Sequence, residues 1–174
     1  LRFGEKGADR ITFFISPNPG EEVKPLASIA SGGELSRIML AVKRVSAAGR
    51  VPTLVFDEID TGVGGAMAQA VGLKLNEVSA SHQVICITHL PQIAAFADSH
   101  WSVVKGRTGE GRTVSSIRAL EGEDRITEIS VMLGGRDVTE TTRSHAKELC
   151  DGARRLIAER DCGGEGGDPD DRGR

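Results

Sequence analysis

Aromatic side chains are scarce in this sequence of 174 residues, making up 3% of it and including no Tyr. Proteins that bind single-stranded nucleic acid without sequence preference use aromatic side chains as platforms on which bases stack, so a surface of that class is not expected. The net charge of -3 provides no general basic field for a phosphate backbone. Contact with nucleic acid would have to come from a local patch or from another part of a larger protein.

The sequence also has few cysteines and no long apolar run. The three cysteines, Cys86, Cys150 and Cys162, are far apart and lack the spacing of metal ligands. Cys86 lies within an apolar run and is interpreted as a small core residue. This usage favours a reducing cytoplasm. No apolar run reaches the roughly 20 residues of a membrane-spanning helix, so no membrane partner is expected.

The two ends of the sequence predict its domain organisation. The chain does not begin with Met, and it starts within what resembles ordered sequence, which favours a fragment of a longer protein. Residues 1–161 are expected to form one domain with its own core. Residues 162–174 are rich in Gly and acids, and we expect them to be a disordered tail.

Apolar periodicity predicts an α/β fold with a mostly parallel sheet flanked by helices. Residues 53–56 and 83–88 are short apolar runs, as in buried parallel strands. Residues 101–105 and 113–119 are expected to form a hairpin. Another strand is expected at 10–16, with a loop after it at 21–30. Helical spacing of apolar residues predicts helices near residues 31–48, 67–79, 91–97, 126–133 and 142–160.

The first of these helices has an apolar stripe and a basic face. The stripe consists of Leu35, Ile38, Met39, Val42 and Val45. Arg37, Lys43 and Arg44 lie off the stripe, and we interpret them as a solvated face rather than a DNA-binding patch.

The start of this helix is open to two interpretations. Ser31 and Glu34 have the spacing of a capping box, which by itself only begins a helix. Gly32 and Gly33 are poor helix formers, at a cost of roughly 1 kcal/mol each, but they leave backbone N–H groups uncovered. Bare N–H groups at the positive end of a helix dipole bind anions. A terminal phosphate is the ligand that we expect there.

Two acids follow the apolar run at 53–56. Paired acids at the end of a strand are often only solvated charges, so the bare pattern is moderately specific. In the functional interpretation, Asp57 holds Mg²⁺, usually through water, because Mg²⁺ prefers oxygen ligands and keeps its waters. Glu58 points elsewhere and polarises an attacking water. The carboxyl ends of parallel strands are where an open α/β sheet places its ligand site.

His89 follows the apolar run at 83–88. A lone His is more often structural, but this one ends the strand expected to neighbour Asp57 and Glu58, where a donor can reach a γ-phosphate. Asp60 lies in a Gly-rich loop and is either a turn residue with local hydrogen bonds or part of a pliable loop that meets a second subunit beside the nucleotide.

These motifs together resemble the C-terminal head segment of the RecN family, SMC-like ABC ATPases of bacterial DNA repair. The resemblance runs from about Gly4 to about Arg160. It depends on four stretches in the right order and spacing, at residues 18–26, 30–41, 56–65 and 88–95. The Glu after the glycine pair, with Leu-Ser-Arg after it, separates this group from transporter ATPases, which usually have Gln there.

The resemblance implies a signature motif that contacts ATP held by the opposite head, Walker B acids, the start of a D-loop, and a switch histidine. The implied catalytic residues are Glu58 and His89, the nucleotide-binding residues are Ser31, Gly32, Gly33, Glu34 and Asp60, and the metal ligand is Asp57. ATP and Mg²⁺ are the implied cofactors.

The resemblance also implies partners. These are an N-terminal P-loop lobe and coiled coil of the same protein, a second head in an ATP-dependent homodimer, and DNA bound through the full-length protein in double-strand break repair, at the bacterial nucleoid. The sequence has no P-loop and no heptad run, so the isolated chain is expected to be inactive. The alternatives are a head lobe of another SMC or recombination-mediator ATPase, or a nucleotide-independent interaction module with the same fold.

Overall fold

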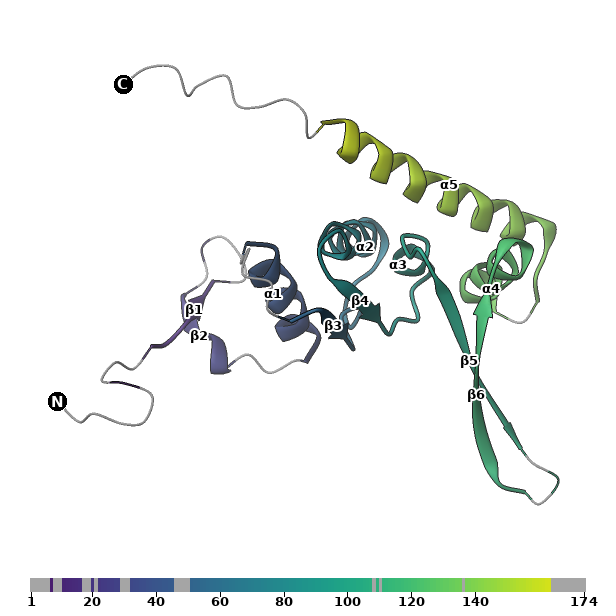
Figure 1. Ribbon diagram of the computed structural model, residues 1–174, viewed down its shortest axis with the longest axis horizontal. Helices are drawn as coiled ribbons and strands as arrows, with labels where there is room; N and C mark the ends of the chain where they lie inside the picture. Colours follow the sequence, from purple (N-terminus) through teal and green to yellow (C-terminus); the bar gives the residue numbers. More distant parts are fainter. Residues whose placement is uncertain are drawn as a thin grey trace.

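The computed structural model describes residues 7, 11–16, 20, 22–28, 32–45, 51–107, 109, 111–135 and 137–163. The architecture is α/β, as predicted (Figure 1). In chain order the elements are β1 (Phe14–Ile15), β2 (Lys24–Pro25), the 3-10 helix η1 (Leu26–Ser28), α1 (Gly32–Val45), β3 (Thr53–Phe56), α2 (Gly65–Ser79), β4 (Gln83–Cys86), α3 (Pro91–Ala94), β5 (His100–Arg107), β6 (Thr113–Leu120), α4 (Gly122–Gly134) and α5 (Glu140–Gly163).

A parallel strand pair lies at the centre of the fold. β3 and β4 pair in parallel, from Thr53 opposite Gln83 to Phe56 opposite Cys86. Since parallel neighbours need a crossover connection, α2 joins the end of one strand to the start of the other. The Ile87 N–H donates to the Phe56 carbonyl at 2.9 Å, just beyond the paired residues. The loops that follow the two strands therefore lie side by side.

Among the described residues, the other two sheets are antiparallel. The hairpin predicted at 101–105 and 113–119 is confirmed as β5–β6, and it projects away from the helices (Figure 1). β1 and β2 form a second antiparallel pair. The predicted parallel pairing therefore holds for β3–β4. β2 and η1 lie in the segment that the sequence predicts as a loop. β2 has two residues, which are too few to leave an apolar period in the sequence, and it is defined by its pairing with β1.

Two apolar clusters hold the elements together. The first packs α2 against one face of β3–β4, and its buried members are Leu40, Leu54, Phe56, Ile59, Ala68, Val71, Leu75, Val78 and Ile93. The second brings the end of α3 together with α4 and α5, and its members are Ala95, Phe96, Ile129, Ala146, Cys150 and Ala153. Gly72 allows a close approach between α2 and the residues after α3, because a Cβ there would lie 2.5 Å from Phe96 Cδ2.

The opposite face of β3–β4 is exposed. Val55 and Ile87 are 63% and 56% exposed, and Ile85 is also exposed. The apolar stripe of α1 is open as well, since Leu35 and Met39 are exposed and, with Val55, line an apolar groove. An apolar stripe normally marks the face of a helix that packs against a core. Leu35 and Met39 of this stripe instead stay exposed in this chain.

The short helix α3 is fixed at its C-terminal end by a side chain from α4. The Arg125 guanidinium donates through Nη2 to three carbonyl oxygens at 2.7 to 3.2 Å, those of Ala94, Ala95 and Ala97. The last carbonyls of a helix have no partner within the helix, so Arg125 supplies one. This anchors the segment that begins directly after His89 and Leu90.

The C-terminal part is a long helix. α5 extends to Gly163, two residues into the tail predicted at 162–174, and the rest of that tail lies outside the described residues. In the part of the chain that the structure describes, no helix combines the length and the apolar character needed to cross a membrane.

Candidate functional site

The two acids that follow β3 differ in backbone conformation. Glu58 has a φ of 56°, and among the described residues it is the only one other than Gly with a positive φ. A left-handed conformation costs a non-Gly residue roughly 1–2 kcal/mol and persists where the surroundings determine it. The Glu58 carbonyl accepts a hydrogen bond from the Thr61 N–H at 3.1 Å, and its own N–H donates to Asp57 Oδ1 at 2.9 Å. The strand thus ends in a tight turn that separates the two carboxylates.

The glycines at the start of α1 lie directly against this turn. A Cβ on Gly32 would be 2.7 Å from Glu58 Oε2, and a Cβ on Gly33 would be 2.7 Å from the Glu58 carbonyl oxygen. Gly33 is buried and would also approach the Thr61 Cβ at 2.9 Å. Gly33 is therefore required for the close approach of α1 to the loop, because the atom it would meet is backbone, whereas the Glu58 side chain could move away from a Cβ on Gly32. The Glu58 carboxylate lies at the end of the helix that favours anions.

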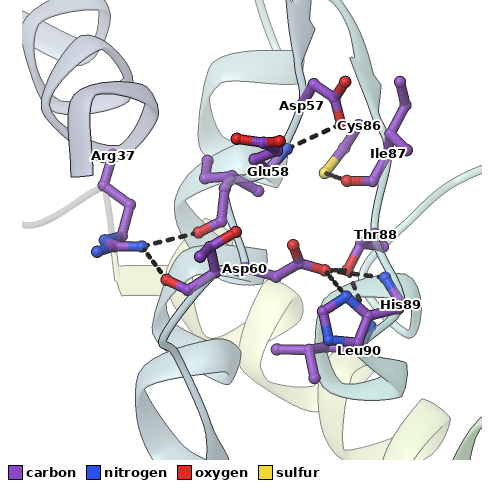
Figure 2. A network of polar contacts seen from close by, with 11 residues as sticks. Arg37, Asp57, Glu58, Asp60, Cys86, Ile87, Thr88, His89 and Leu90 are labelled. Carbon is purple, nitrogen blue, oxygen red and sulfur yellow. Dashed lines mark hydrogen bonds and ion pairs between the residues drawn. The ribbon is translucent and has the colours of Figure 1, made fainter. Parts of the chain in front are cut away.

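Two side chains of α1 that the sequence did not single out as functional complete this contact. Ser36 Oγ donates to the Asp57 carbonyl at 3.0 Å. Arg37 Nη1 donates to the carbonyls of Ile59 at 3.2 Å and Thr61 at 2.9 Å (Figure 2). The interpretation of Arg37 as part of a solvated face is wrong, because its guanidinium binds the loop after β3. The position of Arg37 at the edge of the apolar stripe was the feature of the sequence that could have indicated this contact.

Asp60 points inward, toward the loop after β4 (Figure 2). Its Oδ2 accepts hydrogen bonds from Thr88 Oγ1 at 2.6 Å and the His89 N–H at 2.8 Å, and it lies 2.9 Å from His89 Nδ1. Burial by itself would raise the pKa of Asp60. The hydrogen bonds from Thr88 and His89, and the charge of His89, outweigh that effect and hold the pKa below its usual value of 3.8. Asp60 is therefore an ionised, buried acceptor.

The two loops enclose an open hollow of about 280 Å³ at the carboxyl ends of β3 and β4. It is lined by Asp57, Glu58, Asp60, Thr61, Ile87, Thr88 and His89. Four of the eight residues that the sequence predicts for the site thus line one hollow, and Gly32 and Gly33 adjoin it through Glu58. Glu34 is exposed on the first turn of α1. Ser31 lies outside the described residues.

The carboxylate oxygens in the hollow suit a metal ion that binds together with a phosphate ligand. Among the described residues, no group of three or more His, Cys, Asp and Glu side chains could hold a metal ion by itself. Mg²⁺ is commonly bound by one or two carboxylates together with substrate phosphates and water. The exposed carboxylate of Asp57 fits that kind of site.

The chain is similar in sequence to proteins named "DNA repair protein RecN" in several bacteria. It is 50% identical over 150 residues to the one from Halalkalibacterium halodurans, which covers 86% of this chain and 26% of that protein. It is 48% identical over 150 residues to the one from Bacillus subtilis, with the same coverage. For the one from Streptomyces coelicolor, the values are 48% over 155 residues, 88% of this chain and 27% of that protein. No protein-family model matches.

Two solved structures are similar in backbone. A chain from structural work on ATP-driven dimerization and DNA-stimulated activation of SMC ATPases aligns with a TM-score of 0.48 and 25% identity, over 72% of this chain and 83% of that one. The Smc head domain with a coiled coil and joint from Pyrococcus yayanosii aligns with a TM-score of 0.48 and 26% identity, over 68% of this chain and 25% of that one. The predicted resemblance to the RecN family is confirmed by the sequence matches, and the chain spans about a quarter of the length of the RecN proteins it matches.

Proposed function

We propose that this chain is the C-terminal half of the ATPase head of a RecN-like protein of double-strand break repair. In this proposal the chain supplies Asp57 and Glu58 to ATP bound by its own head, and Ser31, Gly32 and Gly33 to ATP bound by the opposite head. The observation that carries the proposal is the hollow that gathers Asp57, Glu58 and His89 at the carboxyl ends of two parallel strands. Open α/β sheets place ligands at that edge.

Each side chain in the hollow has a separate task. Asp57 would hold Mg²⁺, which would neutralise negative charge on the phosphoryl group that is transferred from ATP. Glu58 would accept a hydrogen bond from the attacking water and orient it. His89, whose side chain is 77% exposed, would donate a hydrogen bond to the terminal phosphate. Catalysis of this kind consists mostly of positioning and charge stabilisation.

The exposed apolar surfaces support a partner lobe. Val55, Ile85 and Ile87 form an apolar sheet face, and Leu35 and Met39 extend it onto α1. Contiguous apolar surface of this kind marks an interface. We assign it to the N-terminal lobe of the same protein, which would bring the P-loop beside the hollow. That lobe and the coiled coil lie in the part of the longer protein that this chain does not contain.

The contact between Gly33 and Glu58 supports a role for α1 in the dimer. The helix start that would bind the terminal phosphate of the opposite head touches the acid that would act on the phosphate of its own head. Docking of the second head would therefore be sensed at the catalytic loop. DNA binding is assigned to the full-length protein, and a cytoplasmic location at the nucleoid follows from that role.

The test is to compare Glu58→Gln with Asp57→Asn in the full-length protein. Glu58→Gln should lower ATP hydrolysis by roughly 10²-fold or more, the usual contribution of a positioned base, while Mg-ATP still binds and dimers accumulate. Asp57→Asn should weaken both Mg-ATP binding and hydrolysis. Glu148→Gln, an exposed site on α5, is the matched control and should change neither.

Equilibrium binding, phosphate release and light scattering provide the three readouts. If both acids affected nucleotide binding equally, the division of roles would be wrong. If the wild-type protein bound no nucleotide, the chain would instead be an interaction module with the same fold.

A further inference from the structure

Asp60 differs from the two acids that precede it in being buried. Its side chain is 5% exposed, whereas Asp57 and Glu58 are open to the hollow. One of its oxygens, Oδ2, lies within 2.9 Å of three donor atoms, two of which belong to His89. A buried carboxylate with this set of donors has little surface left for a ligand. Two of its three contacts are instead with His89.

The ring of His89 depends on this carboxylate for its orientation. The side chain is 77% exposed, so packing does little to restrict it. An ionised carboxylate only accepts hydrogen bonds, so the 2.9 Å contact places the proton of the neutral ring on Nδ1. The backbone N–H of the same residue donates to the same oxygen at 2.8 Å. Asp60 thus fixes both the position of His89 and the nitrogen that carries the proton.

The carboxylate is itself held from both sides. Thr88 Oγ1 donates to Asp60 and accepts from the Leu90 N–H at 3.0 Å. On the other side, Arg37 binds the carbonyls of the residues that flank Asp60 in the chain. A side chain that orients another must be fixed by its own neighbours. Thr88 and Arg37 meet that requirement (Figure 2).

We propose that Asp60 is a positioning residue that acts on nucleotide hydrolysis through His89: its carboxylate accepts the Nδ1–H, and Nε2 is directed to the ligand, to which it donates when the ring is the imidazolium with a proton on both nitrogens. The inference rests on the proposed function, in which His89 faces the terminal phosphate. In this inference Asp60 does not bind the nucleotide directly, as the resemblance implied, but acts through His89. In metal sites, removing a carboxylate that orients a histidine ligand lowers metal affinity or activity by about 10- to 100-fold.

A double-mutant cycle in the full-length protein distinguishes action through His89 from direct action. The variants are Asp60→Asn, His89→Ala and the double variant, with Asp98→Asn at an exposed site as the control. Asp60→Asn should lower kcat by roughly 10-fold or more with little change in the affinity for Mg-ATP. In the His89→Ala background it should change kcat less than about 2-fold, because residues that act as one unit are not additive.

The outcomes separate this inference from the proposed function. If Asp60→Asn lowers kcat equally in both backgrounds, or mainly weakens nucleotide binding, Asp60 does not act through His89 and the inference is overturned while the hydrolytic site stands. If wild type and Glu58→Gln hydrolyse ATP at the same rate, the proposed function itself fails.

A second measurement does not depend on activity or on a variant of Asp60. The full-length protein is labelled with ¹⁵N at histidine, and the His89 signals are identified by their loss in His89→Ala. At a pH where the ring is neutral, we expect the ring proton on Nδ1. A proton on Nε2 would overturn the inference even if the variants of Asp60 failed to fold.

Discussion

Gly33 and the carbonyl oxygen of Glu58 are so close that a Cβ on Gly33 would lie 2.7 Å from that oxygen. The obstacle is backbone, which cannot rotate away as a flexible side chain can. The same hypothetical Cβ would lie 2.9 Å from the Thr61 Cβ. The start of α1 and the loop after β3 are therefore packed as one unit, and a single methyl group at their contact has a measurable cost.

Gly33→Ala should lower the free energy of unfolding by about 1–3 kcal/mol, the usual cost of overpacking a close contact. Hydrolysis should fall too, since Glu58 must shift. Gly152→Ala is the matched control, because a Cβ there meets nothing within 4 Å. In the interior of α5 it should raise stability by roughly 0.5–1 kcal/mol. Denaturant unfolding of both variants checks the signs, and a neutral Gly33→Ala would contradict the close packing.

Arg37→Lys should loosen the loop that carries Glu58 and Asp60. Lysine keeps the charge but replaces the rigid, planar guanidinium, whose Nη1 donates to both carbonyls, with an ammonium on a flexible chain. Hydrogen bonds to charged groups contribute about 1.5–3 kcal/mol, so amide exchange at residues 57–63 should speed up by roughly 10-fold. Arg155→Lys, exposed on α5, is the control. Unchanged exchange in that loop would show that Arg37 does not hold it.

The strands and helices that position the site follow from the sequence, whereas several contacts within it do not. The apolar run at 53–56 coincides with β3, and the glycine pair after Leu133 ends α4, where Gly135 has a φ of 76°. These features depend on local preferences of the backbone. Arg37 and Asp60 make their contacts 22 to 29 residues away along the chain. Helical periodicity carries no information on such pairs.

The stripe of α1 illustrates a second limit. Its spacing correctly predicts a helix with one apolar face, but Leu35 and Met39 of that face are exposed in this chain. Periodicity indicates which residues share a face and not which element covers it. Where the covering element belongs to another part of a longer protein, the pattern and the burial disagree. That disagreement is itself a signal of an interface.

Cys86 should react slowly with alkylating reagents at pH 8, despite its place beside the hollow. Burial raises the pKa of its thiol to about 12, with smaller contributions from the charges of Asp60 and Asp57. The thiolate is the reactive form, so alkylation should be at least about 100-fold slower than for an unperturbed thiol. Cys162 is exposed and should be modified first. Mass spectrometry of iodoacetamide adducts over time checks the order, and early labelling of Cys86 in folded protein would contradict it.

Mixing two inactive variants tests whether the signature acts on the opposite head. Ser31→Arg should block docking of the other head's phosphate, and Glu58→Gln should block hydrolysis in its own head. In a mixed dimer, one site combines the intact acids of the first subunit with the intact signature of the second, and the other site carries both defects. Random pairing of equal amounts makes half the dimers mixed, so about a quarter of wild-type activity should return.

The control for this experiment is each variant alone at the same total concentration, which should stay inactive. Formation of mixed dimers is verified with two affinity tags, because failure to pair would also abolish recovery. If tagged mixed dimers form and remain inactive, there are two explanations. Either the signature and the acids of one head contact the same ATP, or the two sites hydrolyse ATP only when both are intact. Single-turnover hydrolysis with one nucleotide bound per dimer separates these cases, since a complete composite site should then hydrolyse its ATP once. Absence of that single turnover would contradict the assignment of Ser31, Gly32 and Gly33 to the opposite head.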